Sequence, residues 1–223
     1  GPVRYELSDA RARDEGVVAA VDRRVLEVTT SPALARACAR APAGSDEQRV
    51  LAACNPSKMR VLARLLGEAA GGEGHSLPRK ALVYCDKLAA LPLVAAVVEG
   101  VPRMRFAGIF AGSTPAAARD AFLRAMRDPT SPCVGVLTRA GSASLDMAGV
   151  DLVIEVDVGD ASVQKLTQRV GRAQRTHEGK ARARAVALVS AGTREVAFAR
   201  TRVAEDAARG VSVSWDREQD DDP

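Results

Sequence analysis

Residues 105–137 have the sequence RFAGIFAGSTPAAARDAFLRAMRDPTSPCVGVL, and this stretch decides the fold. The apolar runs at 105–109 and 133–137 have the length of buried β-strands. Between them, Thr114 and Pro115 favour a helix start. The residues that follow in the sequence include apolar side chains at helical spacing: Ala118, Ala121, Phe122, Ala125 and Met126. A strand, a helix and a second strand in this order predict two parallel strands covered by the helix.

The same alternation extends along the chain in both directions. Further apolar runs occupy residues 81–85, 152–156 and 185–189, and residues 24–30 alternate like a short strand. Asn55 and Pro56 favour a helix start. Apolar side chains then recur at helical spacing: Met59, Leu62, Leu65, Leu66 and Ala69. Strands that are apolar on both faces, separated by amphipathic helices, predict a three-layer α/β domain with a mainly parallel central sheet.

We expect three parts along the chain. Residues 1–50 form a lead-in segment that packs on the domain, and residues 51–212 form the domain itself. Residues 213–223 form an acidic, disordered tail, because the last eight residues are DREQDDDP.

The composition of the 223-residue chain is that of a globular protein, with 47% hydrophobic and 27% charged residues. The formal net charge is +4, a mild bias toward polyanionic partners. Aromatic residues make up only 3%, which argues against a single-strand-binding surface of stacked rings.

The cysteines are far apart and the chain has only two histidines, so we predict neither a metal site nor a disulfide framework. Cys85 and Cys133 are expected to be core thiols. The chain shows no signal peptide and no apolar run long enough to span a bilayer, so we expect a soluble intracellular protein without a membrane partner.

Residues 168–175 have the sequence QRVGRAQR, the most informative stretch for chemistry. On a helix, an apolar stripe would lie on one side: Val163, Leu166 and Val170. The opposite side would carry an amide and two guanidiniums: Gln168, Arg172 and Arg175. Guanidiniums are the groups that neutralise charge on a transferring γ-phosphate. A solvated basic face is the alternative interpretation of this helix.

A polar loop precedes that helix. It follows the strand at 133–137 and offers hydroxyls, a glycine backbone and a carboxylate: Thr138, Gly141, Ser142, Ser144 and Asp146. Ligands of parallel sheets gather at the carboxyl ends of the strands, so these groups are expected at one edge.

The loop and the Arg-rich helix together resemble motifs V and VI of superfamily 2 helicases. Four further features resemble the C-terminal lobe of the XPB family of DNA translocases. They are Asn55-Pro56-Ser57-Lys58 at a helix start, the strand at 81–85 followed by Asp86, the Gly112-Ser113-Thr114 turn, and Leu188-Val189-Ser190 followed by Thr193, Glu195 and Ala197.

The resemblance implies a RecA-like second helicase lobe that completes an ATP site between two lobes. It implies three catalytic residues, Arg172, Arg175 and Gln168, and three nucleotide-binding residues, Gly141, Asp146 and Arg169. It implies DNA contacts from Ser113, Thr114, Thr138, Ser142 and Ser144; for the first two, backbone N–H groups at a helix start also suit a phosphate. ATP and Mg²⁺ are the expected cofactors. The expected partners are DNA, an N-terminal helicase lobe, and TFIIH-like subunits or a repair nuclease, in the nucleus.

The chain lacks the Gly-x-x-x-x-Gly-Lys-Ser/Thr loop and the acidic box of a complete ATPase, so we expect it to be inactive alone, with the missing lobe N-terminal to Gly1. A chromatin remodeller or an RNA helicase is the alternative within the superfamily. A non-catalytic scaffold is the alternative of another class, and Ser142 supports it because the XPB family usually has Asp there. Lys58 and Arg60 are expected to form a solvated face.

Overall fold

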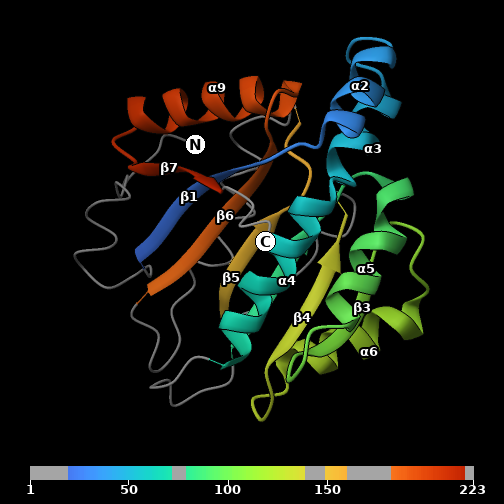
Figure 1. The fold of residues 1–223 in the computed structure, drawn as a ribbon. Coiled ribbons are helices and arrows are strands. Elements are labelled where there is room, and N and C mark those ends of the chain that lie inside the picture. Colours follow the sequence, from blue (N-terminus) through green and yellow to red (C-terminus); the bar gives the residue numbers. More distant parts are fainter. Residues whose placement is uncertain (1–19, 72–78, 139–148, 160–181, 219–223) are drawn as a thin grey trace, which may run out of the picture.

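The computed structural model describes residues 20–71, 79–138, 149–159 and 182–218. Within these residues, seven strands form one sheet in the order β3-β4-β2-β5-β6-β1-β7, and every neighbouring pair is parallel (Figure 1). The strands are β1 (Ala20–Val28), β2 (Lys80–Tyr84), β3 (Arg105–Phe110), β4 (Cys133–Leu137), β5 (Val150–Glu155), β6 (Arg182–Ser190) and β7 (Val213–Glu218). The strands expected in the middle of the chain are thereby confirmed.

Helices cover both faces of this sheet (Figure 1). Helices α4 and α5 pack on one face, and α6 and α9 pack on the other. The helices are α2 (Pro32–Arg40), α3 (Asp46–Ala53), α4 (Pro56–Gly71), α5 (Leu91–Glu99), α6 (Ala116–Arg127) and α9 (Arg194–Ala208), with a short 3₁₀ turn η1 (Leu88–Ala90) before α5. The predicted three-layer α/β class is confirmed.

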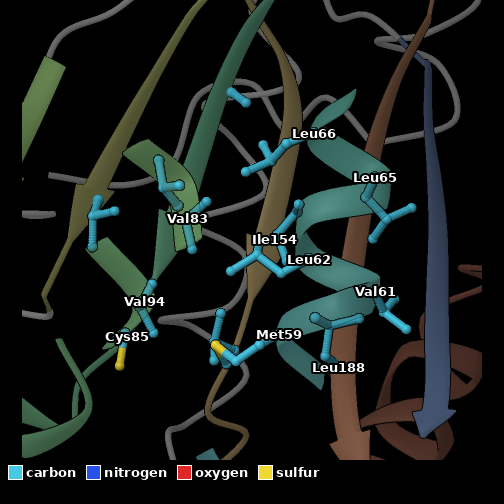
Figure 2. Close-up of a cluster of buried hydrophobic side chains, with 14 of the residues drawn as sticks. Met59, Val61, Leu62, Leu65, Leu66, Val83, Cys85, Val94, Ile154 and Leu188 are labelled. Carbon is cyan, nitrogen blue, oxygen red and sulfur yellow. The ribbon is translucent and has the colours of Figure 1, made fainter. Parts of the chain in front are cut away.

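The largest core cluster lies under α4. Its apolar stripe, which includes Leu62 and Leu66, packs on Val83, Ile154 and Leu188 from three neighbouring strands (Figure 2). Successive residues of a strand point to opposite faces, so residues next to these in sequence line the other core. Val153 accordingly lies in the cluster beneath α6. Burial on both faces explains why these strands carry near-continuous apolar runs.

The structure contradicts two expectations, one about the C-terminal residues and one about the buried stripe of α6. Residues 213–218 are not disordered but form β7, which pairs with β1 in parallel. Acidic residues fit in this strand because it lies at the edge of the sheet and exposes them to solvent. One of them, Asp216, also pairs with Arg24, whose Nε lies 3.5 Å away. On α6, Ala118 and Ala121 are exposed, and only the later residues of the predicted stripe are buried: Phe122, Ala125 and Met126.

The N-terminal segment contributes more than a lead-in. Strand β1 lies between β6 and β7, and its Leu26 and Val28 belong to the core under α4. Helices α2 and α3, which the sequence pattern did not indicate, each start at a serine whose hydroxyl accepts a backbone N–H: Ser31 from Leu34 and Ser45 from Gln48. No helix among the described residues has the length and apolarity to cross a bilayer.

Candidate functional site at the carboxyl edge of the sheet

The parallel strands bring their carboxyl ends to one edge, where polar residues follow each apolar run. Asp86 follows β2, Thr138 follows β4, Asp157 follows β5, and Ser190 ends β6. Strands β4 and β5 lie on either side of β2. The loops that begin after β4 and β5 therefore start roughly 10 Å apart, which is two strand spacings.

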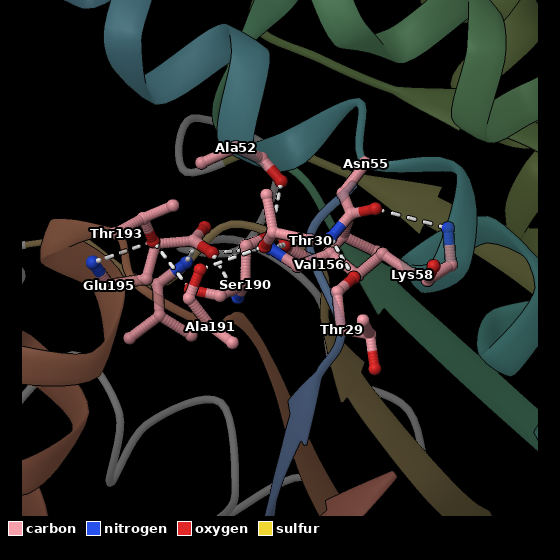
Figure 3. A network of polar contacts seen from close by, with 12 residues as sticks. Thr29, Thr30, Ala52, Asn55, Lys58, Val156, Ser190, Ala191, Thr193 and Glu195 are labelled. Carbon is pink, nitrogen blue, oxygen red and sulfur yellow. Dashed lines mark hydrogen bonds and ion pairs between the residues drawn. The ribbon is translucent and has the colours of Figure 1, made fainter. Parts of the chain in front are cut away.

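Asn55 joins three parts of this edge. Its amide nitrogen donates to the Thr29 carbonyl (2.9 Å) and to Ser190 Oγ (3.2 Å), and its Oδ1 accepts the Ser57 N–H (3.1 Å) at the start of α4. Ser190 Oγ in turn donates to the Ala52 carbonyl (2.8 Å). Asn55 is fully buried, so its side chain caps α4 and links it to β1 and β6 (Figure 3).

Lys58 does not lie on a solvated face, contrary to our expectation. Its side chain is fully buried, and Nζ donates to Glu195 Oε2 (2.6 Å) and to the Val156 carbonyl (2.7 Å). A buried ammonium requires a partner charge and hydrogen bonds, and both are present. Helical spacing places Lys58 on the same face as Leu62 and Leu65, so it starts the buried stripe of α4. Arg60, in contrast, is exposed.

Glu195 receives hydrogen bonds from three directions in the first turn of α9. Besides Lys58, its carboxylate accepts the Ser190 N–H (2.9 Å) and the Val158 N–H (3.3 Å). The Thr193 hydroxyl accepts the Glu195 N–H and so begins the helix. An acidic side chain in the first turn also has a favourable interaction with the helix dipole.

The segment that leaves β5, residues 155–159, is fixed by its neighbours. The Asp157 carboxylate accepts the Asp86 N–H with both oxygens (3.0 and 2.9 Å). Arg202 of α9 donates to Glu155 Oε2 and to the Gly159 carbonyl, each at 2.9 Å. The end of β5 is therefore held from β2, α4 and α9 together.

Three of the predicted DNA-binding residues lie in the described part of the chain. Ser113 is exposed on the turn after β3. The Thr114 hydroxyl accepts the Ala111 N–H (2.8 Å) and donates to the Ile109 carbonyl (3.2 Å), so it stabilises that turn. Thr138 is buried, and its N–H donates to the Phe110 carbonyl (3.1 Å). Because β3 and β4 are neighbours, all three lie at the same edge.

Arg119 holds the turn from the first half of α6. Its guanidinium donates to the Thr114 carbonyl (2.7 Å) and the Gly112 carbonyl (2.8 Å), and it lies 5.5 Å from the centre of the Phe110 ring. Arg119 therefore joins the turn to α6, and Ser113 between the two bonded carbonyls remains exposed. Sequence reasoning missed this role of Arg119, because nothing in its local pattern distinguishes it from a solvated arginine.

The other predicted site residues lie outside the described residues. They are Gly141, Ser142, Ser144, Asp146, Gln168, Arg169, Arg172 and Arg175.

A pocket opens at the same edge between α3, the end of β2 and the start of α9. Its lining mixes charges of both signs, with Arg49, Lys87 and Arg194 beside Asp86 and Asp157. Among the described residues, no three His, Cys, Asp or Glu side chains come together to hold a metal ion. Cys85 lies behind this pocket in the core, and burial together with the nearby Asp157 carboxylate raises the pKa of its thiol to about 12. It is therefore no nucleophile at neutral pH.

The parallel sheet with helices on both faces has the fold of RecA-like helicase C-terminal domains, as matches to solved structures show. The C-terminal domain of the DEAD-box protein Dbp5 matches with a TM-score of 0.59 at 14% identity, over 89% of this chain and 91% of that one. Domain 2 of the Mss116p DEAD-box helicase, bound to an RNA duplex, matches with a TM-score of 0.60 at 14% identity, over 89% and 64%. The C-terminal part of the Fun30 ATPase domain matches with a TM-score of 0.53 at 18% identity, over 65% and 44%.

The sequence itself identifies the family. Residues 30–210 match the ERCC3/RAD25/XPB C-terminal helicase family, and the chain belongs to it. No curated protein sequence matches the chain. The chain spans less than half of the Fun30 chain that it matches.

Two of the sequence features that resemble the XPB family meet in space. Asn55-Pro56-Ser57-Lys58 and the stretch from Leu188 to Ala197 contact each other through Asn55 with Ser190 and Lys58 with Glu195 (Figure 3). The sequence alone assigns these residues no common role. The position of Lys58 on the apolar stripe of its helix is the signal that could have revealed its burial.

Proposed function

We propose that this chain is the second lobe of an XPB-type, ATP-dependent DNA translocase that acts in transcription initiation or nucleotide excision repair. In this proposal Arg172 and Arg175 neutralise charge on the γ-phosphate of ATP, and Gln168 organises them. Gly141, Asp146 and Arg169 lie against the nucleotide.

One observation carries the proposal. The chain leaves β4 at Thr138 and β5 at residues 155–159, and these two exits flank β2 at the carboxyl edge. The predicted nucleotide-binding loop follows the first exit, and the predicted arginines follow the second. Two segments that must act on one nucleotide thus begin at neighbouring places on the edge where parallel sheets bind ligands.

ATP and Mg²⁺ would be held mainly by a first lobe. The sequence has no phosphate loop, and the described residues form no metal-binding cluster. The contribution of this chain would be cationic side chains, which suit the oxygens of a phosphate. Such a half-site has no activity without its complement, so the 223-residue chain alone is expected to hydrolyse no ATP.

The DNA strand would lie along the turn after β3 and the loop after β4. Ser113 offers an exposed hydroxyl there, and the start of α6 offers backbone N–H groups. Thr114 and Thr138 would support this surface from behind, and Ser142 and Ser144 would extend it. TFIIH-like subunits or a repair nuclease are the proposed partners, and the nucleus is the proposed location.

The test replaces each arginine by alanine in a protein that carries both helicase lobes. Arg172→Ala or Arg175→Ala should lower DNA-stimulated ATP turnover by roughly 10³-fold or more, the scale of an arginine finger. Melting temperature and DNA affinity should stay close to those of the parent protein. Unchanged turnover in both variants would refute the proposal, and it would favour a scaffold that keeps the helicase fold without the chemistry.

A further inference from the structure

Every residue of the β5 exit segment (residues 155–159) is held by a side chain or a backbone partner from another element. The Glu155 carboxylate and the Gly159 carbonyl both accept from Arg202. The Val156 carbonyl accepts from Lys58, and the Val158 N–H donates to Glu195. The Asp157 carboxylate accepts from the Asp86 N–H.

Arg202 contacts both ends of this segment at once. One guanidinium nitrogen lies 2.9 Å from Glu155 Oε2, and the other lies 2.9 Å from the Gly159 carbonyl. The side chain is 8% exposed and that of Glu155 is 3% exposed, so water cannot replace either contact easily. A planar guanidinium can serve two acceptors in fixed directions, whereas a lysine ammonium has no such fork.

We propose that Arg202 is a positioning residue for ATP hydrolysis. It fixes the direction in which the chain leaves Gly159 toward the segment that carries Arg172 and Arg175. This inference rests on the proposed function, because it concerns the placement of the same arginines. Lys58 and Glu195 hold the middle of the exit segment and support it, but they also join α4 to α9, so a change there has wider effects.

The energetic reason is the strict geometry of a transition-state contact. A misplacement of about 1 Å can lower a rate by about 10²-fold. A shift in the exit direction at Gly159 would displace the arginines without removing them. Loss of positioning therefore appears in kcat, whereas the affinity for ATP, held mainly by the other lobe, stays the same.

The chain contains a matched control on the same helix. Arg23 of β1 lies 2.9 Å from Asp206 of α9, with side chains 8% and 5% exposed. This ion pair has the length and burial of the Arg202–Glu155 pair, but no hydrogen bond of Arg23 among the described contacts reaches residues 155–159. Any general destabilisation of α9 by a shortened cation should therefore appear in both variants.

The experiment compares Arg202→Lys with Arg23→Lys by two measurements. In the 223-residue chain, amide NMR signals of Val158 and Gly159 should shift in Arg202→Lys and stay in place in Arg23→Lys. In a protein with both lobes, Arg202→Lys should lower kcat by about 10-fold to 100-fold, with KM for ATP unchanged within a factor of about two. Arg23→Lys should keep the parent kcat. If Arg202→Lys does not fold, Arg202→Gln, whose single side-chain nitrogen cannot reach both acceptors, is compared with Arg23→Gln by the same two measurements.

Equal kcat losses in the two lysine variants, or no loss in Arg202→Lys, would overturn the positioning role. Arg172→Ala separates this failure from failure of the proposed function. If Arg172→Ala abolishes turnover while Arg202→Lys does not lower it, only the positioning role is wrong. If Arg172→Ala keeps normal turnover, the proposed function is wrong and the positioning role falls with it.

Discussion

Lys58 Nζ lies 2.6 Å from Glu195 Oε2, and the two side chains are 0% and 6% exposed. The residues are 137 positions apart in the sequence. Their contact joins the first turn of α4 to the first turn of α9 across the ends of β5 and β6. Two sequence features that look like separate family signatures therefore each supply one residue of the same ion pair.

Lys58→Met should lower the free energy of unfolding by about 3–5 kcal/mol, because it leaves the Glu195 carboxylate buried without its counter-charge. Urea unfolding followed by the fluorescence of Trp215, the single tryptophan, measures this. The double variant Lys58→Met with Glu195→Gln should lose less than Lys58→Met alone, since no unpaired charge remains. Additive losses in the double variant would show that the two side chains are not coupled.

Gly135→Ala should destabilise the domain by about 1–3 kcal/mol. A Cβ at this position of β4 would lie 2.3 Å from the Phe122 ring, which is buried and packs edge-on against Phe110. Gly67→Ala, within α4, meets nothing within 4 Å and should stabilise the domain by about 0.5–1 kcal/mol. Thermal melting of the two variants checks the prediction, and a neutral Gly135→Ala would mean that Phe122 moves aside freely.

Stability should fall as the pH rises above 9, in part because of Cys85. The pKa of its thiol is near the ordinary value of 9.0 in the unfolded chain and about 12 in the folded one. Ionisation between these values favours the unfolded state, so stability is fully present below pH 9 and is lost toward pH 12. At pH 10 the loss is roughly 1 kcal/mol. Urea titrations at about pH 8 and pH 10, under reducing conditions, should show a smaller decline for Cys85→Ala than for the parent, and equal declines would disprove the effect.

Substitutions at Thr114 and Ser113 should have different effects, the first on the stability of the domain and the second on its affinity for DNA. Thr114→Val leaves the Ala111 N–H without its acceptor and should cost about 1–3 kcal/mol of stability. Ser113→Ala removes an exposed hydroxyl and should leave the melting temperature unchanged while it weakens DNA binding several-fold. Fluorescence anisotropy with a labelled duplex measures the affinity. A stable Thr114→Val, or a Ser113→Ala with full affinity, would contradict this division of roles.

The middle of the fold could be predicted because burial on both faces leaves a simple pattern. Residues 133–137 are apolar throughout and form β4, fully buried, as expected. Strand β7 could not be predicted from such a pattern, because an edge strand is exposed to solvent and tolerates acidic residues. There Arg64 lies 2.5 Å from Glu218, and Arg217 lies 3.6 Å from Glu27. Such pairs form only after the sheet has brought distant residues together.

The sequence predicted where the candidate site lies on the sheet, but it did not predict the hydrogen bonds and ion pairs between its residues. The order of strands and loops indicated the carboxyl edge, and Ser113, Thr114 and Thr138 do lie there. The prediction for Lys58 was wrong because lysine is seldom buried without a partner, and its partner is remote in sequence. Ser45 with Gln48 is a helix-start signal that we missed: the Gln48 side chain accepts the Gly44 N–H as the Ser45 hydroxyl accepts the Gln48 N–H.

The position of β1 between β6 and β7 has a consequence for biosynthesis. β1 precedes the other six described strands in the sequence, yet its parallel partners are residues 182–190 and 213–218. At ordinary translation speeds of about 5–20 residues per second, β1 spends roughly 10–40 s without them. Val25, Leu26 and Val28, buried in the finished domain, lack their partner strands throughout that interval. During synthesis β1 therefore exposes these apolar side chains until the last of the described strands has been made.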